Sequence, residues 1–282
     1  MANLQSAHRG SLLGLAVGDA MGYTVDSRSW QEITEDFGPN GLLGYDLANG
    51  YADVTSYTQL AAFTCNGLLL GMTRGQMTGR MAPFVKYIGL SSREWAASQR
   101  PYGRPEKSFC WLLHQGDICR RHCMDTRMLD TLSRENLGTP EEPKNVFAGP
   151  GSLTAALGVG LFFDREGLEQ REVDRLGAEA VALTHGSPTA FLSGAALTHI
   201  ISRMLWNPKL PLKKAVLEAA EAVKAAEAVE AAEIVETVEA AEAVEAAEIV
   251  EIVEVAEAVE TVEVVEAEKA VEAEETKRQL EL

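Results

Sequence analysis

Residues 1–206 consist of apolar segments at helical spacing, separated by short stretches rich in glycine, proline and polar side chains. The segment SLLGLAVGDAMG, residues 11–22, predicts a helix in which Gly14, Gly18 and Gly22 are four residues apart on one face. Because glycine has no side chain, such a face allows close approach of the backbone to another helix or to a ligand.

A second helix is predicted from the stretch SYTQLAAFTCNGLLLG, residues 56–71. Its buried face should hold Leu60, Phe63, Thr64, Gly67 and Leu68. The first four residues are all polar, and Ser56 with Gln59 has the S-x-x-Q form of a capping box. This polar cluster is therefore either the cap of the helix or the place where a reactive centre should lie.

A third strong helix prediction covers residues 187–206, with Ser187 as the N-cap and Pro188 at the first helical position. The sequence NPKLP, residues 207–211, should end this helix. Loops are predicted for three stretches rich in Gly, Pro, Asn or Asp, namely residues 38–51, 98–108 and 138–152. No alternating strand pattern is longer than a few residues, so the expected fold class is all-α.

The end of the chain has a different pattern. From Glu218 to Glu266 an acidic residue recurs at every third position, with Lys224 as the single exception. Since three and seven share no factor, Glu falls on every heptad position in turn and no apolar coiled-coil seam survives. The tail is therefore expected to be either a solvated helix or a disordered polyanion. The predicted division is a helical domain over 1–206, a linker over 207–213 and a repetitive acidic tail over 214–282.

Charge is concentrated in this tail. Residues 213–282 carry 21 Glu against 6 Lys or Arg, which accounts for −15 of the formal charge of −17 and leaves the body near neutrality. Neither part has the basic surface that nucleic-acid binding needs. The tail would also be repelled by an anionic membrane surface. Nucleic acid and membranes are therefore not expected as partners.

The cysteines and the N-terminus suggest a cytoplasmic protein. Four cysteines in a chain of this length favour free, buried thiols over a disulfide framework. The sequence CRRHC places Cys119, His122 and Cys123 on one helical face, but a zinc site would need a fourth ligand. The N-terminus lacks a signal-peptide pattern, and no apolar run approaches the roughly 20 residues of a membrane span.

Five segments, in order, resemble the ADP-ribosylglycohydrolase (DraG-like) family. They are RGSLLGLAVGDAMGYTVD, EDFGPNGLLGY, TSYTQLAAFTCNGLLL, GPGSLTAALGVGLFF and LGAEAVALTHGSPTAFLSGAAL, and they extend over about residues 9–206. The resemblance implies an all-α domain in which two Mg²⁺ ions assist cleavage of the glycosidic bond to ADP-ribose. It ends near Trp206, so the C-terminal part of the family domain is expected to be missing.

The resemblance also implies that the metal ligands are altered. In the family, a Thr-Asp-Asp-Thr motif at the start of a helix supplies the first ligands, and here it reads Thr55-Ser56-Tyr57-Thr58. A Ser hydroxyl is at best a neutral ligand, whereas Mg²⁺ prefers anionic oxygen. A later Gly-Asp-x-Asp-Thr motif has no counterpart in the chain. Asp53 is close in sequence but three residues out of register. We therefore expect no metal and no other cofactor.

Other positions match the ligand pocket of the family. Asp26 occupies the position of a Glu on a mobile loop that is proposed to gate or assist catalysis, but it is one methylene shorter. Asp19 alone is better explained as a structural hydrogen-bonding residue, and His185 as a packed or capping residue. The positions that the resemblance assigns to the pocket are Gly18, Asp19, Gly22, Thr55, Ser56, Tyr57, Gly149, Gly151, Ser152 and His185.

Three hypotheses about function follow. The favoured one is a catalytically inactive relative that serves as a binding or assembly module, with an ADP-ribose-like ligand as a candidate. The alternatives are an active hydrolase with atypical Mg²⁺ ligands and a structural protein that works through its acidic tail. With the last third of the family domain missing, we expect the exposed core to be covered by self-association or by residues 217–229 packing back.

Overall fold

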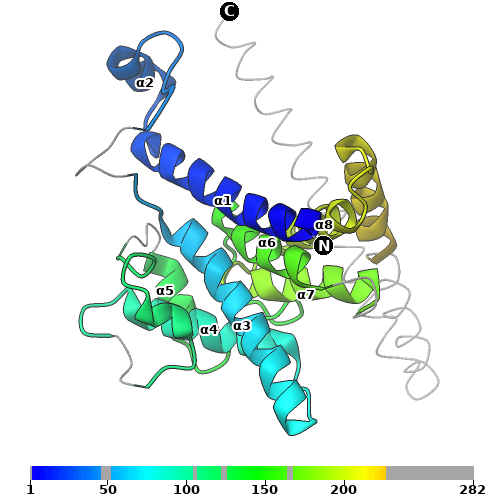
Figure 1. Ribbon diagram of the computed structural model, residues 1–282. Helices are drawn as coiled ribbons and strands as arrows, with labels where there is room; N and C mark the ends of the chain where they lie inside the picture. The colour runs from blue at the N-terminus through cyan, green and yellow to red at the C-terminus, as the bar shows by residue number, and fades with distance from the viewer. Residues whose placement is uncertain (1, 46–51, 104–106, 122–125, 164–167, 227–282) are drawn as a thin grey trace, which may run out of the picture. The chain divides into compact units, whose positions relative to one another are not determined.

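The computed structural model describes residues 2–45, 52–103, 107–121, 126–163 and 168–226. All regular structure in these residues is helical, which confirms the all-α prediction (Figure 1). The described residues up to Val223 belong to one compact unit. Its labelled helices are α1 (Ala2–Val25), α2 (Trp30–Phe37), α3 (Ser56–Thr78), α4 (Phe84–Ser98), η2 (Trp111–His114), α5 (Thr126–Leu132), η3 (Pro150–Ser152), α6 (Leu153–Phe162), α7 (Gln170–Ala182) and α8 (Pro188–Trp206).

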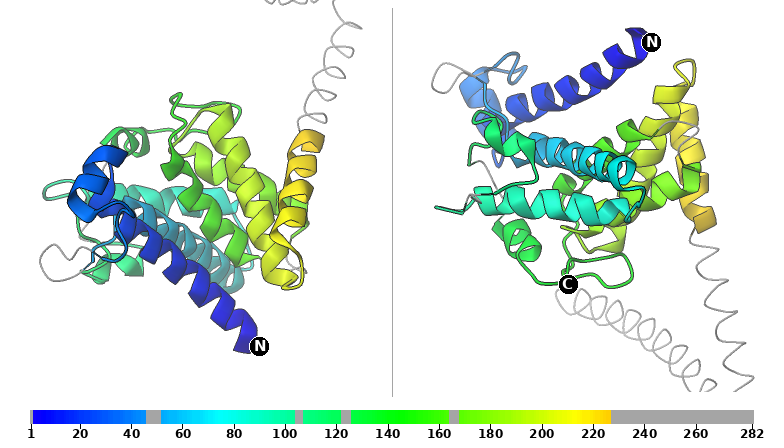
Figure 2. Two further views of the ribbon diagram at one scale, coloured as in Figure 1. Left: turned by 90° about the horizontal axis from the view of Figure 1, so that it is seen from above. Right: turned by 60° about the horizontal axis from the view of Figure 1, so that its bottom comes forward.

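Helix α3 is the central element of this unit. The face predicted from the sequence is buried, with Phe63 and Leu68 fully inaccessible and Leu60 only 4 % exposed. Gly67 lies where α3 crosses α4, and a methyl group placed on it would come within 2.7–2.9 Å of backbone atoms of Tyr87 and Ile88. The two helices thus pack backbone to backbone at this point. Figure 2 shows α1 along the outside of the unit, with α3 between it and α4.

The predicted capping box at Ser56 and Gln59 is wrong. Thr55 is the N-cap, with extended backbone and a side chain that accepts a hydrogen bond from the Tyr57 N–H. Gln59 is fully buried instead. Its amide accepts a hydrogen bond from Trp95 Nε1 at 2.9 Å and donates one to the Arg120 carbonyl at 2.8 Å. Burying an amide without hydrogen-bond partners would cost free energy. Gln59 is instead paired within the core between α3 and α4, and it does not cap the helix.

Helices α6, α7 and α8 form the other part of the core, and small residues let them approach closely. A methyl group on Gly160 would lie 2.9 Å from Ile201 Cβ, and one on Gly194 would lie 2.5 Å from Val181 Cγ2. Between α7 and α8, the ring nitrogen Nδ1 of His199 lies 2.7 Å from an Asp174 carboxylate oxygen, and both side chains are largely buried. These contacts hold α6 and α8 as one wall of the cavity described below.

The helix after α8 covers part of this body. Helix α8 ends at Trp206, as the NPKLP sequence predicts, and a new helix spans residues 212–226. In it Ala215 and Ala219 are buried, and Glu218 pairs with Arg203 of α8 at 3.1 Å. Residues at the start of the predicted tail thus pack back on the body, although Leu217 itself is 56 % exposed. The remaining tail repeats lie outside the described residues.

The cysteines that the structure describes are free thiols, in line with the sequence prediction. They are Cys65, Cys110 and Cys119, whereas Cys123 and His122 lie outside the described residues. Burial raises the pKa of the Cys65 thiol to about 11 and that of Cys110 to about 12. Both therefore stay protonated near neutral pH and serve as packing groups rather than nucleophiles. Within the described ranges, no helix is long and apolar enough to cross a membrane.

The crossing of α3 and α4 leads to a first prediction. Gly67→Ala should lower the free energy of unfolding by about 1–3 kcal/mol, because the new methyl group meets backbone that cannot move aside. Gly10→Ala is the matched control, since a methyl group there meets nothing within 4 Å and alanine favours a helix. Urea unfolding followed by circular dichroism measures both. Equal stability of the two variants would contradict the close crossing.

Candidate functional site

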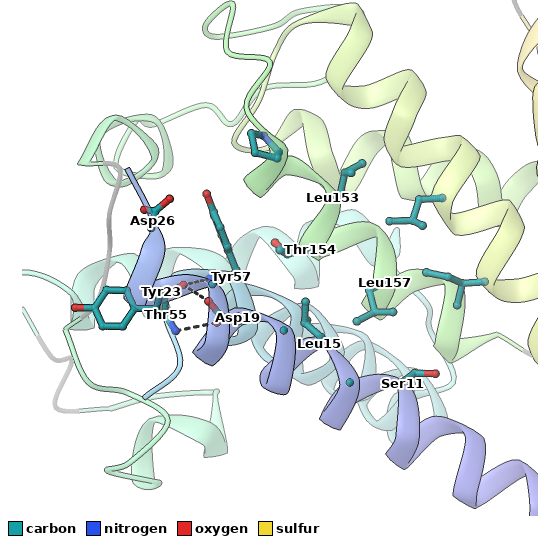
Figure 3. A pocket seen from close by; sticks show the side chains of 16 residues that line it. Ser11, Leu15, Asp19, Tyr23, Asp26, Thr55, Tyr57, Leu153, Thr154 and Leu157 are labelled. Atoms are coloured by element: carbon teal, nitrogen blue, oxygen red, sulfur yellow. Dashed lines mark hydrogen bonds between the residues drawn. The ribbon is translucent and has the colours of Figure 1, made fainter. Parts of the chain in front are cut away.

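A cavity of about 590 Å³ lies between α1, the start of α3, and the wall formed by η3, α6 and α8. This volume is in the range typical of small-molecule sites. Figure 3 shows its two unlike ends, with Asp19, Tyr23, Asp26, Thr55 and Tyr57 gathered at one end and Leu153 and Leu157 toward the other.

The glycine face of α1 lines this cavity. Gly14, Gly18 and Gly22 all border it, and a methyl group on any of them would meet nothing within 4 Å. No other helix among the described residues approaches this face closely. The open space that the glycines leave is compatible with the other explanation, approach to a ligand.

The wall opposite α1 is apolar. Leu153 and Leu157 are one helical turn apart on α6, and Leu197 and Ile201 have the same spacing on α8. Each pair therefore projects from one face of its helix. Leu15 of α1 completes a trough that has hydrocarbon on both sides.

The polar end of the cavity is organised by Asp19. One carboxylate oxygen accepts hydrogen bonds from the N–H groups of Thr55 and Thr58 at 2.8 and 3.1 Å and from the Thr58 hydroxyl at 2.6 Å. The other oxygen accepts from the Thr55 hydroxyl at 2.6 Å. Asp19 therefore caps the N-terminus of α3 from a neighbouring helix, where the helix dipole favours a negative charge.

Two residues follow this cap and point in different directions. Tyr57 lines the cavity, and its ring packs against η3, since a methyl group on Gly151 would lie 2.7 Å from Tyr57 Cε1. Ser56 is fully buried, and its hydroxyl has no hydrogen-bond partner in the structure. A buried hydroxyl without a partner is uncommon and costs stability. The pair thus contributes one aromatic ring and one sequestered hydroxyl.

The pocket residues predicted from the sequence fall into two groups. Those that line the cavity are Gly18, Asp19, Gly22, Asp26, Thr55 and Tyr57. Those outside its lining are Ser56, Gly149, Gly151, Ser152 and His185, although Pro150 of the same glycine-rich segment does line it.

His185, a member of this second group, is buried. Its Nδ1 lies 2.9 Å from the Thr184 hydroxyl, and a methyl group on Gly149 would be 3.7 Å from its Nε2. These surroundings agree with the interpretation of His185 as a packed residue that supports the glycine-rich segment.

The other acidic residues near α3 have separate surroundings. Asp53 pairs with Arg120 at 3.2 Å, and its other oxygen accepts the Val54 N–H at 3.0 Å. Asp26 is exposed at the edge of the cavity and has no hydrogen-bond or ion-pair partner among the described residues. Across the part of the chain that the structure describes, no three His, Cys, Asp or Glu side chains come together as metal ligands would.

The apolar wall and the role of Thr58 are two features of the site that sequence patterns did not predict. The i, i+4 spacing of Leu153 with Leu157, and of Leu197 with Ile201, marks one face of each helix. Such a face looks the same in sequence whether it packs in a core or borders a cavity. The hydroxyl of Thr58 could have been anticipated only by knowing that α1 places Asp19 beside the start of α3.

Comparison with known proteins gives one match. The family model for ADP-ribosylglycohydrolase matches residues 1–276, a span that extends beyond the segment over which individual motifs are recognisable. No curated protein and no solved structure matches the chain.

The cap on α3 leads to a second prediction. Asp19→Asn should lower the free energy of unfolding by about 1–3 kcal/mol, because an amide nitrogen would face the donors of Thr55 and Thr58. Asp26→Asn, at the exposed edge of the same cavity, should change it by less than about 0.5 kcal/mol. Urea unfolding of both variants measures the difference. An Asp19→Asn variant that is as stable as the unsubstituted protein would show that this carboxylate does not stabilise the start of α3.

Proposed function

The chain belongs to the ADP-ribosylglycohydrolase family, and we propose that it is an inactive member that acts as a binding or assembly module. Hydrolysis of a glycosidic bond is the activity expected of a working member. One observation carries the proposal. At the start of α3 the aromatic ring of Tyr57 rests on Gly151, and the Ser56 hydroxyl beside it is buried.

These residues do not fit a pair of Mg²⁺ ions. Mg²⁺ takes octahedral oxygen ligands at about 2.0–2.1 Å, usually with one or two carboxylates. Tyr57 presents a bulky phenol in place of a carboxylate. The Ser56 hydroxyl is neutral and lies outside the cavity lining. The helix end that should supply two anionic ligands therefore supplies none.

Neighbouring carboxylates do not replace them. Both oxygens of Asp19 already accept hydrogen bonds from Thr55 and Thr58. Releasing Asp19 to a metal would leave these donors without their acceptor and uncap α3. Asp53 is held by Arg120, which stabilises the carboxylate without a metal. Without a dinuclear centre, the cavity would lack the metal-bound water that metal-assisted hydrolysis uses.

A role in binding or assembly is supported by what the chain retains. The cavity has the size of a small-molecule site. On the outer side of α1, Leu13 is 57 % and Val17 46 % exposed. Exposed aliphatic side chains on one helix favour contact with another protein surface. We propose self-association through α1 as the simplest way to cover them.

Catalytic inactivity leads to a third prediction. The full chain, incubated with a mono-ADP-ribosylated peptide and Mg²⁺, should release no ADP-ribose above the level of a buffer control. High-performance liquid chromatography of the nucleotide measures the release. An active member of the family, assayed in parallel, shows that the peptide is a competent substrate.

Variants identify the site if any release is seen. Release that EDTA abolishes, and that Ser56→Ala or Asp19→Asn also abolishes, would overturn the proposal by assigning a working metal centre to the start of α3. Release that is insensitive to EDTA would equally contradict inactivity. Asp130→Asn, at an exposed residue of α5 that pairs with Arg100, is the control for non-specific effects.

A further inference from the structure

We infer that the cavity binds a small amine with an apolar body, and not an anionic nucleotide such as ADP-ribose. This inference rests on the proposed loss of the metal centre, because a metal would reverse the charge of the polar end. The inference concerns the chemical class of the ligand. Neither membership of the family nor a loss of catalysis determines that class.

The first argument is the shape and polarity of the trough. The glycine face of α1 leaves open space at Gly14 and Gly18, and the facing wall offers Leu153, Leu157 and Ile201. Burying hydrocarbon is worth about 25 cal/mol per Å². An apolar ligand body therefore gains free energy along the whole trough, whereas a ribose or a diphosphate there would lose contacts with water.

The second argument is charge. Among the described residues, those that line the cavity include two carboxylates, Asp19 and Asp26, and no Lys, Arg or His. The charge of Asp19 is offset by four donors at the positive end of α3. Asp26 has no partner among the described residues, so it supplies the net negative charge of this end. A diphosphate would be repelled there, and an ammonium group would be attracted.

The third argument is the position of these parts relative to one another. Asp26 lies at the opposite end of the cavity from Leu157, with Tyr57 between them (Figure 3). A ligand whose apolar body lies along the leucines can therefore place its ammonium group beside Asp26. The rings of Tyr23 and Tyr57, which both line the cavity, can in addition attract a cation through their faces.

The test compares two probes that differ only in the charged group. Isothermal titration calorimetry with the full chain measures 4-(1-naphthyl)butylamine against 4-(1-naphthyl)butanoate, with ADP-ribose in metal-free buffer as a third probe. The amine should bind at least about tenfold more tightly than the carboxylate, because reversing one charge near a carboxylate changes the interaction by about 2 kcal/mol at 4 Å in water. ADP-ribose should show no binding at concentrations at which the amine saturates the cavity.

A matched pair of variants locates the binding. Gly14→Leu should weaken amine binding at least about tenfold, because the new side chain fills open space in the trough. Gly10→Leu makes the same change one turn earlier on α1, also in open space but outside the cavity lining, and should leave binding unchanged. At both positions the first side-chain carbon meets nothing within 4 Å, and leucine favours a helix, so both variants should fold. Asp26→Asn should remove most of the preference for the amine over the carboxylate, a loss of about tenfold, because it removes both the attraction of one probe and the repulsion of the other.

Several outcomes would overturn the inference. They are equal binding of amine and carboxylate, amine binding that Gly14→Leu leaves intact, metal-free binding of ADP-ribose, and no binding of the amine. None of these depends on release of ADP-ribose, so they can be told apart from failure of the proposed inactivity. Release of ADP-ribose together with a preference for the amine in metal-free buffer would refute the proposed inactivity, and with it the exclusion of ADP-ribose, but would leave the preference for an amine standing.

Discussion

The carboxylate of Asp19 ties α1 to the start of α3, and the arrangement of the site depends on it. Four donors of Thr55 and Thr58 converge on its two oxygens. Helix α1 has only Ala20 among its described buried residues, so apolar packing does little to place it. Together with the 2.8 Å hydrogen bond between the His8 ring and the Leu161 carbonyl of α6, these hydrogen bonds set where the glycine face of α1 lies. The width of the trough beside α6 and α8 follows from that position.

The same helix end bears on the proposed absence of a metal centre. In a site built on metal, carboxylates at the first turn of α3 would face one another and need the ions to compensate their charge. Here that turn presents Ser56 and Tyr57, and the carboxylate that is hydrogen-bonded to it belongs to α1 and acts as a cap. In the proposed inactive member, this cap replaces the stabilisation that a bound ion would provide.

Much of the fold could be predicted from the sequence because helix patterns are local. The buried face of α3, the break after Trp206 and the absence of strand patterns all depend on the spacing of neighbouring residues. The cap of α3 was assigned to Ser56 instead of Thr55 because two adjacent hydroxyl residues look equivalent until the backbone is known. The pairing of Gln59 with Trp95 joins residues 36 apart and has no local pattern. Part of the site was predictable from the motif positions. Its apolar wall was not, because the sequence does not show which space the packed side chains leave unfilled.

The hydrogen bond between Gln59 and Trp95 has a consequence for spectroscopy. All four tryptophans lie in described residues, and Trp95 is the one that is fully inaccessible, whereas Trp30 and Trp111 are more than half exposed. A water-soluble quencher such as acrylamide can reach the exposed indoles in the folded protein but reaches Trp95 only when α3 and α4 separate. The indole of Trp95 is thus a built-in fluorescent reporter of the core, and no label is needed to follow its opening.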